Sequence, residues 1–302
     1  MTGLTRRGFT ALSGAALLAQ RAALAQQGNR DAAALIQRAI PATGELLPAV
    51  GLGTAQVFDS NDDRTRDSAT RVVRALLEGG GRLIDTSSVY GDAEQVLGQV
   101  MAAGGWRDKV FVATKLEAPD AAELERSQTR LATRRIDLLQ LHNVSNPNQS
   151  LSRFKAWKTQ GLCRYIGITS TYRGAYAALE AVLQREKPDF VQIDYSIDNR
   201  DAEVRILPLA ADVQAGVLTA LPFGRGRLFR AVRGKPVPDW AAGFATSWAS
   251  FFLKFLLGDP RVTAVIPGTS DAGHMADNLG AMRGRLPDAD ERRRMVEFVR
   301  SL

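Results

Sequence analysis

Four side chains that are able to move a proton follow three successive apolar runs of the chain. Asp85 closes the first run and Tyr90 lies five residues beyond it, Lys115 ends the second run, and His142 ends the third. A free phenol has a pKa of about 10, and a nearby ammonium favours the phenolate and lowers that pKa. We therefore expect Lys115 to make Tyr90 a better general acid, or a base in reverse, towards an oxygen that gains negative charge. Asp85 would pair with Lys115 and keep it charged, and His142 would hydrogen-bond the same oxygen.

Each of these residues also has an ordinary structural interpretation. Asp85 could cap a helix, Tyr90 could pack within a loop, Lys115 could be a solvated strand end, and His142 could be a satisfied core histidine. The chain has only two histidines, however, and one of them stands at this point. The arrival of all four at the ends of neighbouring apolar runs favours the catalytic interpretation.

These residues need a scaffold that brings strand ends together. Eight short apolar runs alternate with helical patterns, which predicts a parallel sheet and, with eight units, a closed (β/α)8 barrel of the α/β class. The predicted strands are residues 49–54, 83–86, 110–114, 136–141, 165–169, 190–195, 216–221 and 262–266. The predicted helices between them are residues 64–78, 93–102, 121–133, 151–159, 172–185, 202–212 and 242–257. An open doubly wound sheet is the alternative, but no G-x-G-x-x-G follows the first strand.

Two flanking features complete the predicted domain. A turn signal, Pro-Ala-Thr-Gly at residues 41–44, separates two short apolar segments within residues 35–50 and predicts a small β-hairpin before the barrel. Residues 274–284 and 288–302 are predicted as two further helices after it. We expect residues 35–302 to form one domain, because the sequence contains no internal boundary, repeat or low-complexity segment.

The first 25 residues predict export. Arg6 and Arg7 precede a charge-free apolar run at residues 11–19 and a small-residue cleavage site at residues 23–25, the pattern of a twin-arginine signal peptide. That run is too short for a stable transmembrane span. We expect the twin-arginine export machinery to deliver the protein to the periplasm, with residues 26–34 as a flexible spacer and no membrane anchor after cleavage. A basic, disordered arm is the alternative.

The composition narrows the classes of function. The 302 residues carry a net charge of +7, but no block of lysine and arginine interleaved with aromatic residues suggests a nucleic-acid surface. Cys163 is the only cysteine, so no intrachain disulfide can form even after export.

Three motifs resemble the aldo/keto reductase family. They are Asp85-Thr86-x-x-x-Tyr90-Gly91-x-x-Glu94, Thr114-Lys115 and Asp137-Leu138-x-x-Leu141-His142. The resemblance extends from the hairpin to the C-terminal helices. In that family the positions of Asp85, Tyr90, Lys115 and His142 form the catalytic tetrad. The resemblance therefore implies reduction of an aldehyde or ketone, or the reverse, with a hydride from NAD(P)H, a proton from Tyr90 and no metal.

The same resemblance implies the residues that hold the cofactor. Thr169 and Ser170 end the fifth strand where the family binds the carboxamide of nicotinamide, and Gln192 stands at the family's amide-binding glutamine. The segment from Gly268 resembles the part that holds the adenosine phosphate and adenine. The full set that the resemblance implies is Gly53, Thr54, Asp85, Thr169, Ser170, Gln192, Leu221, Phe223, Gly268, Thr269, His274 and Asn278.

Two departures from the family pattern concern the cofactor. The usual stacking tyrosine falls on Ala220, so nicotinamide stacking would pass to Leu221 or Phe223 or be weak. Gly268 and His274 replace basic positions of the 2′-phosphate segment, and histidine is mostly neutral at pH 7. NADP is therefore expected over NAD only as a preference. Arg225 or Arg227 could clamp the pyrophosphate, with a solvated loop as the plainer interpretation.

The substrate pocket is weakly marked. Candidate lining residues are Val57, Phe58, Val89, Trp106 and Asn143, although any of them could be ordinary rim or core. No long loop follows the fourth strand, so we expect an open site for a small or variable carbonyl compound. We also expect the protein to be a monomer.

Two other functions stay open at this stage. A Schiff-base lyase would use Lys115 as its nucleophile, although pairing with Asp85 argues against this by keeping the amine protonated. A nucleotide-binding sensor or accessory protein with little turnover would explain Ala220, the weakened phosphate segment and the export signal.

Overall fold

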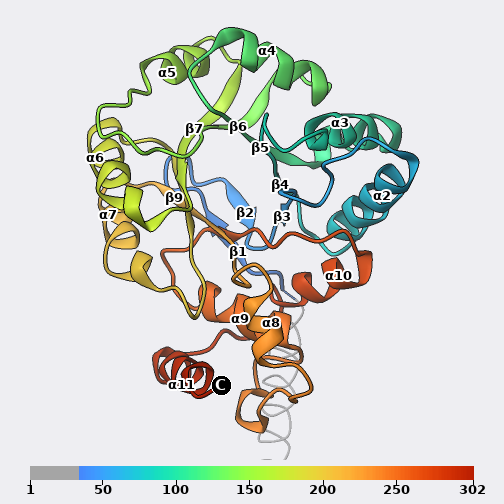
Figure 1. Ribbon diagram of the computed structural model, residues 1–302, viewed down its shortest axis with the longest axis vertical. Coiled ribbons are helices and arrows are strands. Elements are labelled where there is room, and N and C mark those ends of the chain that lie inside the picture. Colours follow the sequence, from blue (N-terminus) through green and yellow to red (C-terminus); the bar gives the residue numbers. More distant parts are fainter. Residues whose placement is uncertain (1–33) are drawn as a thin grey trace, which may run out of the picture.

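The computed structural model describes residues 34–302, so the predicted twin-arginine signal and all but the last residue of the predicted spacer lie outside the described residues. Eight strands form one parallel sheet in the order β10-β9-β8-β7-β6-β5-β4-β3. Their bounds are β3 Leu52–Gly53, β4 Leu83–Asp85, β5 Phe111–Leu116, β6 Ile136–Leu141, β7 Cys163–Ser170, β8 Phe190–Asp194, β9 Gly216–Ala220 and β10 Ala264–Val265. Figure 1 shows these strands at the centre of the molecule with helices arranged around them.

The first and last strands of the sheet also meet, and their contact closes it. Val50 bridges to Val265 and Gly53 bridges to Gly268, both in parallel orientation. The amide of Gly51 donates to the carbonyl of Val265 at 2.8 Å. The predicted (β/α)8 barrel is thereby confirmed. Closure also brings the carboxyl ends of all eight strands to one mouth, which is where such barrels place their chemistry.

Helices follow the strands in sequence and surround the barrel. They are α2 Asp63–Glu78, α3 Ala93–Gly104, α4 Ala121–Arg130, α5 Ser152–Thr159, α6 Tyr176–Glu186, α7 Ile206–Asp212, α8 Arg227–Ala231, α9 Trp248–Leu257, α10 Ala272–Gly280 and α11 Ala289–Arg300. The start of α2 is set by Asp62, whose side chain accepts a hydrogen bond from the amide of Thr65. The helix then buries its apolar stripe, which includes Val72, Val73 and Leu76. None of the helices among residues 34–302 has the length and apolar character needed to cross a membrane.

The main differences from the predicted elements lie after β9. The helix expected from residue 242 begins only at Trp248, because Ser247 and Ser250 form a capping box there and Asp239–Ala241 is a separate 3₁₀ turn. Helix α8 was not predicted, since its five residues, Arg227–Ala231, are too few to carry a helical period.

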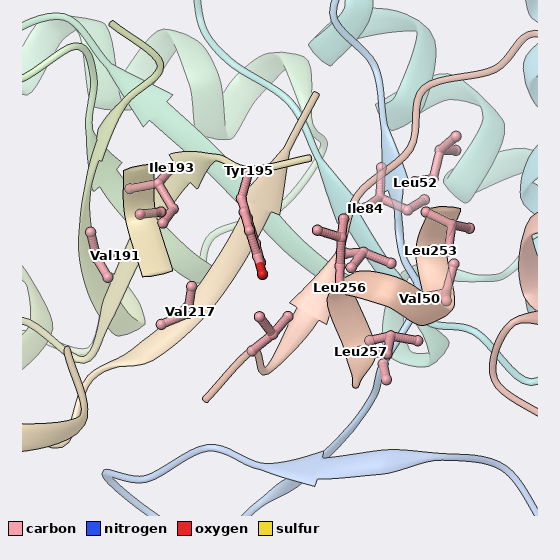
Figure 2. Close-up of a cluster of buried hydrophobic side chains, with 14 of the residues drawn as sticks. Val50, Leu52, Ile84, Val191, Ile193, Tyr195, Val217, Leu253, Leu256 and Leu257 are labelled. Atoms are coloured by element: carbon pink, nitrogen blue, oxygen red, sulfur yellow. The ribbon is translucent and has the colours of Figure 1, made fainter. Parts of the chain in front are cut away.

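Two buried clusters divide the core. The larger lies between the strands and the surrounding helices, and Figure 2 shows members of it from the strand segments and from α9, among them Val50, Ile84, Val217, Leu253 and Leu256. The smaller fills the inside of the barrel, from the end opposite the mouth up to Ala220 and Ile266 at the carboxyl ends of β9 and β10. There Phe111, Tyr165 and Phe190 contact one another through their rings, with centroids 5.6 to 6.4 Å apart.

The predicted hairpin covers that end of the barrel. Strand β1 Gln37–Ala39 pairs antiparallel with β2 Leu46–Pro48, and Ile40 and Leu47 beside them join the smaller cluster. Glu45 in the turn accepts hydrogen bonds from Arg82 and from the Tyr165 hydroxyl, each at 2.7 Å, and forms an ion pair with Arg164. Burial raises the pKa of Glu45, but the hydrogen bonds and the arginine charges outweigh it and hold the pKa below its usual value.

Replacing this carboxylate tests how far the hairpin stabilises the barrel. Glu45→Ala removes one acceptor each from Arg82, Arg164 and Tyr165 and should lower the free energy of unfolding by about 1–3 kcal/mol at pH 7, measured by urea titration. The lowered pKa places the stabilisation above about pH 4.3, and it should fade as the pH falls below that value. Glu125→Ala, on the exposed face of α4, is the control. An equal loss in both variants at pH 7 would contradict this assignment.

Candidate active site

A buried ion pair lies at the centre of the mouth. The Lys115 Nζ atom, from β5, donates to Asp85 Oδ2 of β4 at 2.6 Å and to the carbonyl of Thr86 at 2.6 Å. Only 1% of Lys115 and 3% of Asp85 is exposed. The two strands pair directly, with Asp85 opposite Ala113, so their adjacent carboxyl ends bring the two charges together.

Tyr90 stands next to this pair. The Lys115 Nζ atom is 4.8 Å from the centroid of the Tyr90 ring. The loop that carries Tyr90 turns at Gly91, where φ is +53° and a Cβ would lie 2.4 Å from the carbonyl oxygen of Asp59. Any larger residue there would force the loop away, so the Tyr-Gly pair in the sequence follows from this close approach.

The electrostatics of Tyr90 differ from the sequence-based expectation. The Lys115 charge does lower the pKa of Tyr90, but burial raises the pKa by more and Asp85 raises it further, so the net shift is upward. The prediction of a lowered pKa is therefore wrong for the protein alone, because the sequence did not show how deeply the phenol is buried. Tyr90 is accordingly a protonated phenol at neutral pH, the form that a proton donor needs.

His142 follows β6 and faces Tyr90, with ring centroids 5.9 Å apart in an edge-to-face arrangement. Its Nδ1 atom is hydrogen-bonded to Glu117 Oε1, and the hydroxyl of Ser87 lies 3.5 Å from the same nitrogen. Burial and the charge of Lys115 lower the pKa of His142, while Glu117 acts in the opposite direction. The sequence analysis missed Glu117, and its position two residues after Lys115 was the available signal.

Two glutamines, from the neighbouring strand β6 and from β8, support the ion pair. Gln140 Nε2 donates to Gln192 Oε1 at 2.9 Å and lies 3.3 Å from Asp85 Oδ1, and Gln192 Nε2 lies 3.3 Å from Asp85 Oδ2. Gln192 was expected to bind a nicotinamide amide, and it also holds Asp85. Gln140 was not predicted, although a polar residue inside the apolar run of β6 marked it.

A cavity of about 400 Å³ opens above these groups, and we call it the catalytic cavity. It brings together all four proposed catalytic residues and the predicted cofactor residues Gly53, Thr54, Asp85, Thr169, Gln192, Leu221, Phe223 and Gly268. Val57, from the predicted substrate pocket, also lines it.

A second cavity of about 410 Å³ shares Phe223 and Gly268 with the catalytic cavity. It is lined by the remaining predicted residues of the adenosine segment, Thr269, His274 and Asn278, and by the aromatic rings of Phe229 and Trp248. The two cavities therefore form adjoining halves of one extended site. No arginine or lysine is among the residues that line the second cavity.

Five predicted site residues do not line either cavity. Ser170 is buried beyond Thr169, and Phe58 has no exposed surface, because it packs in the core beside Val57. Val89 is 52% exposed at the rim, Asn143 is exposed beyond His142, and Trp106 contacts the Arg74 guanidinium. Sequence position alone did not distinguish the side of the chain that each residue presents.

The loop after β9 contributes a cation to the site. Arg225 lines the catalytic cavity, whereas Arg227 is paired with Asp198 at 2.7 Å. Among residues 34–302, no group of three or more histidine, cysteine, aspartate and glutamate side chains is arranged to hold a metal ion.

The dependence of the site on its ion pair can be measured by unfolding. Lys115→Met leaves the Asp85 carboxylate buried without its counter-charge and should lower the free energy of unfolding by about 3–5 kcal/mol. The double variant Asp85→Asn, Lys115→Met should recover part of that loss, because it removes both charges. Lys155→Met, which breaks the surface pair with Glu186, is the control and should cost about 0–1 kcal/mol. If the loss of stability in the double variant equalled the sum of the losses in Asp85→Asn and Lys115→Met, the coupling would be contradicted.

Comparison with known proteins places this site in a family. A family model described as the aldo/keto reductase family matches residues 49–295. The uncharacterized oxidoreductase YrpG of Bacillus subtilis is 30% identical over 62% of this chain and 66% of its own length, so the chain spans just under two thirds of that relative. Methylglyoxal reductase YeaE of Escherichia coli is 27% identical over 84% of this chain and 92% of its own length.

A solved structure extends the comparison to the fold. The aldo/keto reductase from Klebsiella pneumoniae, determined with NADP and acetate, has a TM-score of 0.70 at 24% identity, over 85% of this chain and 93% of that one. At this identity the likeness establishes the barrel alone. The match of the family model, which spans nearly the whole barrel, decides the assignment: the chain belongs to the aldo/keto reductase family of oxidoreductases.

Proposed function

We propose that the protein reduces a small aldehyde or ketone to an alcohol with NAD(P)H, or catalyses the reverse oxidation. The observation that carries the proposal is the Lys115 ammonium, held by Asp85 and placed 4.8 Å from the ring of Tyr90 in a cavity that His142 also lines. A buried cation beside a phenol stabilises negative charge on the phenol oxygen as the proton leaves.

The residues of the site divide the work of proton transfer. Tyr90 gives its proton to the oxygen of the reduced carbonyl, and Lys115 compensates the charge that develops on the phenol oxygen. Asp85 fixes Lys115, while the Thr86 carbonyl and the two glutamines fix the pair. His142 orients the substrate oxygen from the opposite side. A bound dihydronicotinamide would supply the hydride, which no amino-acid side chain can supply.

The chain offers a suitable site for such a dinucleotide. Leu221 and Phe223 give apolar surface beside the catalytic residues, Arg225 gives a cation in the catalytic cavity, and Phe229 and Trp248 give aromatic surface in the second cavity. The preference for NADP over NAD stays a prediction from the sequence. His274 is the basic side chain among the residues that line the second cavity, so a 2′-phosphate would meet it there.

The two alternative functions fare differently. A Schiff-base lyase needs a free amine, and the contacts of Lys115 Nζ with Asp85 and Thr86 oppose that role. A nucleotide-binding protein with little turnover keeps one supporting observation, which is that Ala220 lines the catalytic cavity where a stacking tyrosine is usual. It is the second candidate.

A turnover assay separates these functions. Purified protein with NADPH or NADH and a panel that includes methylglyoxal should oxidise the cofactor only when a carbonyl compound is present, monitored by nicotinamide absorbance. Tyr90→Phe keeps the ring but lacks the proton, so its kcat should fall roughly 10²–10⁴-fold while dinucleotide binding is retained. Tyr172→Phe, at a tyrosine that is 72% exposed, is the control. Saturable binding of both cofactors with no turnover would favour the second candidate, and the better cofactor decides between NADP and NAD.

We also propose that the protein is exported to the periplasm by the twin-arginine route, on the pattern of residues 6–25. Replacing both Arg6 and Arg7 by lysine should retain the protein in the cytoplasm, because the receptor for this signal reads the two arginines. Cell fractionation and immunoblotting would measure this, with the unchanged chain as control. Periplasmic delivery of the double variant would contradict the proposed route. Light scattering would test the prediction that the mature protein is a monomer, because it measures the molar mass in solution.

A further inference from the structure

Glu117 occupies a position that the tetrad does not explain. It lies just after β5 and hydrogen-bonds Nδ1 of His142. Within the described residues no hydrogen-bond partner is present for Nε2, and His142 lines the catalytic cavity, so Nε2 is the nitrogen that remains for substrate. We propose that Glu117 is a positioning residue that fixes the proton of neutral His142 on Nδ1, and thereby makes hydrogen-bond donation from Nε2 depend on protonation of the ring.

The backbone that carries Glu117 is anchored by Glu123. The carboxylate of Glu123, in α4, accepts a hydrogen bond from the amide of Glu117 at 3.1 Å and lies 3.4 Å from the amide of Ala118. It also accepts from the hydroxyl of Ser88 at 2.6 Å, which ties the segment to the loop before Tyr90. Glu117 therefore approaches His142 from an anchored segment, although about half of its own side chain is exposed to solvent.

The chemistry of a carboxylate decides the tautomer. An ionised carboxylate only accepts hydrogen bonds, so the nitrogen that meets Glu117 must carry the proton. Neutral His142 then has a bare Nε2, which can accept from a hydroxyl group but cannot donate to a carbonyl oxygen. When the ring is protonated, Nδ1–H still meets Glu117 and Nε2–H becomes available to the substrate.

The other charged groups around His142 determine how easily it protonates. Lys115 of β5 disfavours the imidazolium, and Asp85 of β4 and Glu117 favour it. Tyr90 contributes an uncharged ring edge, and Ser87 contributes a hydroxyl close to Nδ1. Burial and Lys115 prevail, and they hold the pKa of His142 below its usual value of about 6.5.

The consequence for the reaction rests on the proposed function. In reduction Tyr90 gives the proton, and the protonated His142 ring supplies a second hydrogen-bond donor that holds the carbonyl oxygen. Oxidation begins with an alcohol, whose hydroxyl the neutral Nε2 accepts. Carbonyl reduction should therefore decline as the pH rises through the pKa of His142. Without Glu117, the neutral ring is free to carry its proton on Nε2 and keep its donor, so the decline should largely disappear.

The tautomer can be measured without any turnover. The chain contains two histidines, so nitrogen NMR of protein labelled at histidine gives two sets of ring signals, and His274→Gln identifies those of His142. At pH 8 the unchanged protein should show a protonated Nδ1 and a bare Nε2 at His142. Glu117→Gln should move the proton to Nε2 in part or in full. A protonated Nε2 in the unchanged protein at pH 8, or the same tautomer in both proteins, would overturn the proposal.

The pH profile tests the consequence. From the pKa of His142 to two pH units above it, kcat/KM for reduction should fall roughly 50-fold in the unchanged protein and less than about 10-fold in Glu117→Gln. Glu123→Gln is the matched control: it disturbs the anchored segment but keeps the Glu117 carboxylate, so it should lower activity by one factor at every pH and retain the steep decline. A steep decline in Glu117→Gln would overturn the proposal and leave the reductase function intact. Absence of turnover in every protein would contradict the reductase function, and the NMR result would still decide the tautomer.

Discussion

The ion pair between Asp85 and Lys115 is the constraint on which the rest of the site depends. Two charges that are almost wholly buried cost several kcal/mol each to remove from water, and only close pairing with further hydrogen bonds makes their burial tolerable. Those hydrogen bonds come from β6 and β8, through Gln140 and Gln192, as well as from the Thr86 carbonyl beside β4. The pair is thus satisfied only when strands from several parts of the sheet stand in their barrel positions. Folding and assembly of the catalytic centre are for this reason the same event.

The buried charge of Lys115 acts on the rings of Tyr90 and His142, and burial shifts the pKa values of these two rings in opposite directions. Lys115 lowers the pKa of Tyr90 and of His142 alike, whereas burial raises the pKa of the phenol and lowers that of the imidazole. Both rings are consequently neutral in the protein alone at neutral pH. Neutral Tyr90 is a phenol that still carries its proton, whereas neutral His142 is an imidazole that lacks the second proton of the imidazolium. Glu117 works against this loss, because its carboxylate favours the imidazolium.

The sequence predicted the architecture well wherever a local pattern was self-contained. The run Ile136–Leu141 was predicted with the bounds that β6 has, since charged residues precede it and a histidine follows it. The hairpin followed from its turn residues. What failed depended on contacts between distant segments: the start of α9 depends on the Ser247 and Ser250 capping box, and the upward shift in the pKa of Tyr90 depends on burial by the assembled mouth. Phe58 is wholly buried, Asn143 is exposed, and neither lines the cavity, which no spacing rule for loops predicts.

The closed end of the barrel holds contacts that stabilise the fold, and the mouth holds the groups that react. The closed end holds the aromatic rings of Phe111, Tyr165 and Phe190, which contact one another, and the Glu45 ion pairs of the hairpin. At the mouth, the ion pair lies on strands, whereas Glu117 lies on the segment that follows β5 and is anchored through Glu123 to α4. A substitution at Glu117 can therefore alter the proton on His142 without removing any hydrogen bond of the Asp85–Lys115 pair. The strands carry the central ion pair, and the segment after β5 carries the group that we propose to set the pH at which the site works. That division allows the pH response of such a barrel to change by one residue while its fold and its central ion pair stay as they are.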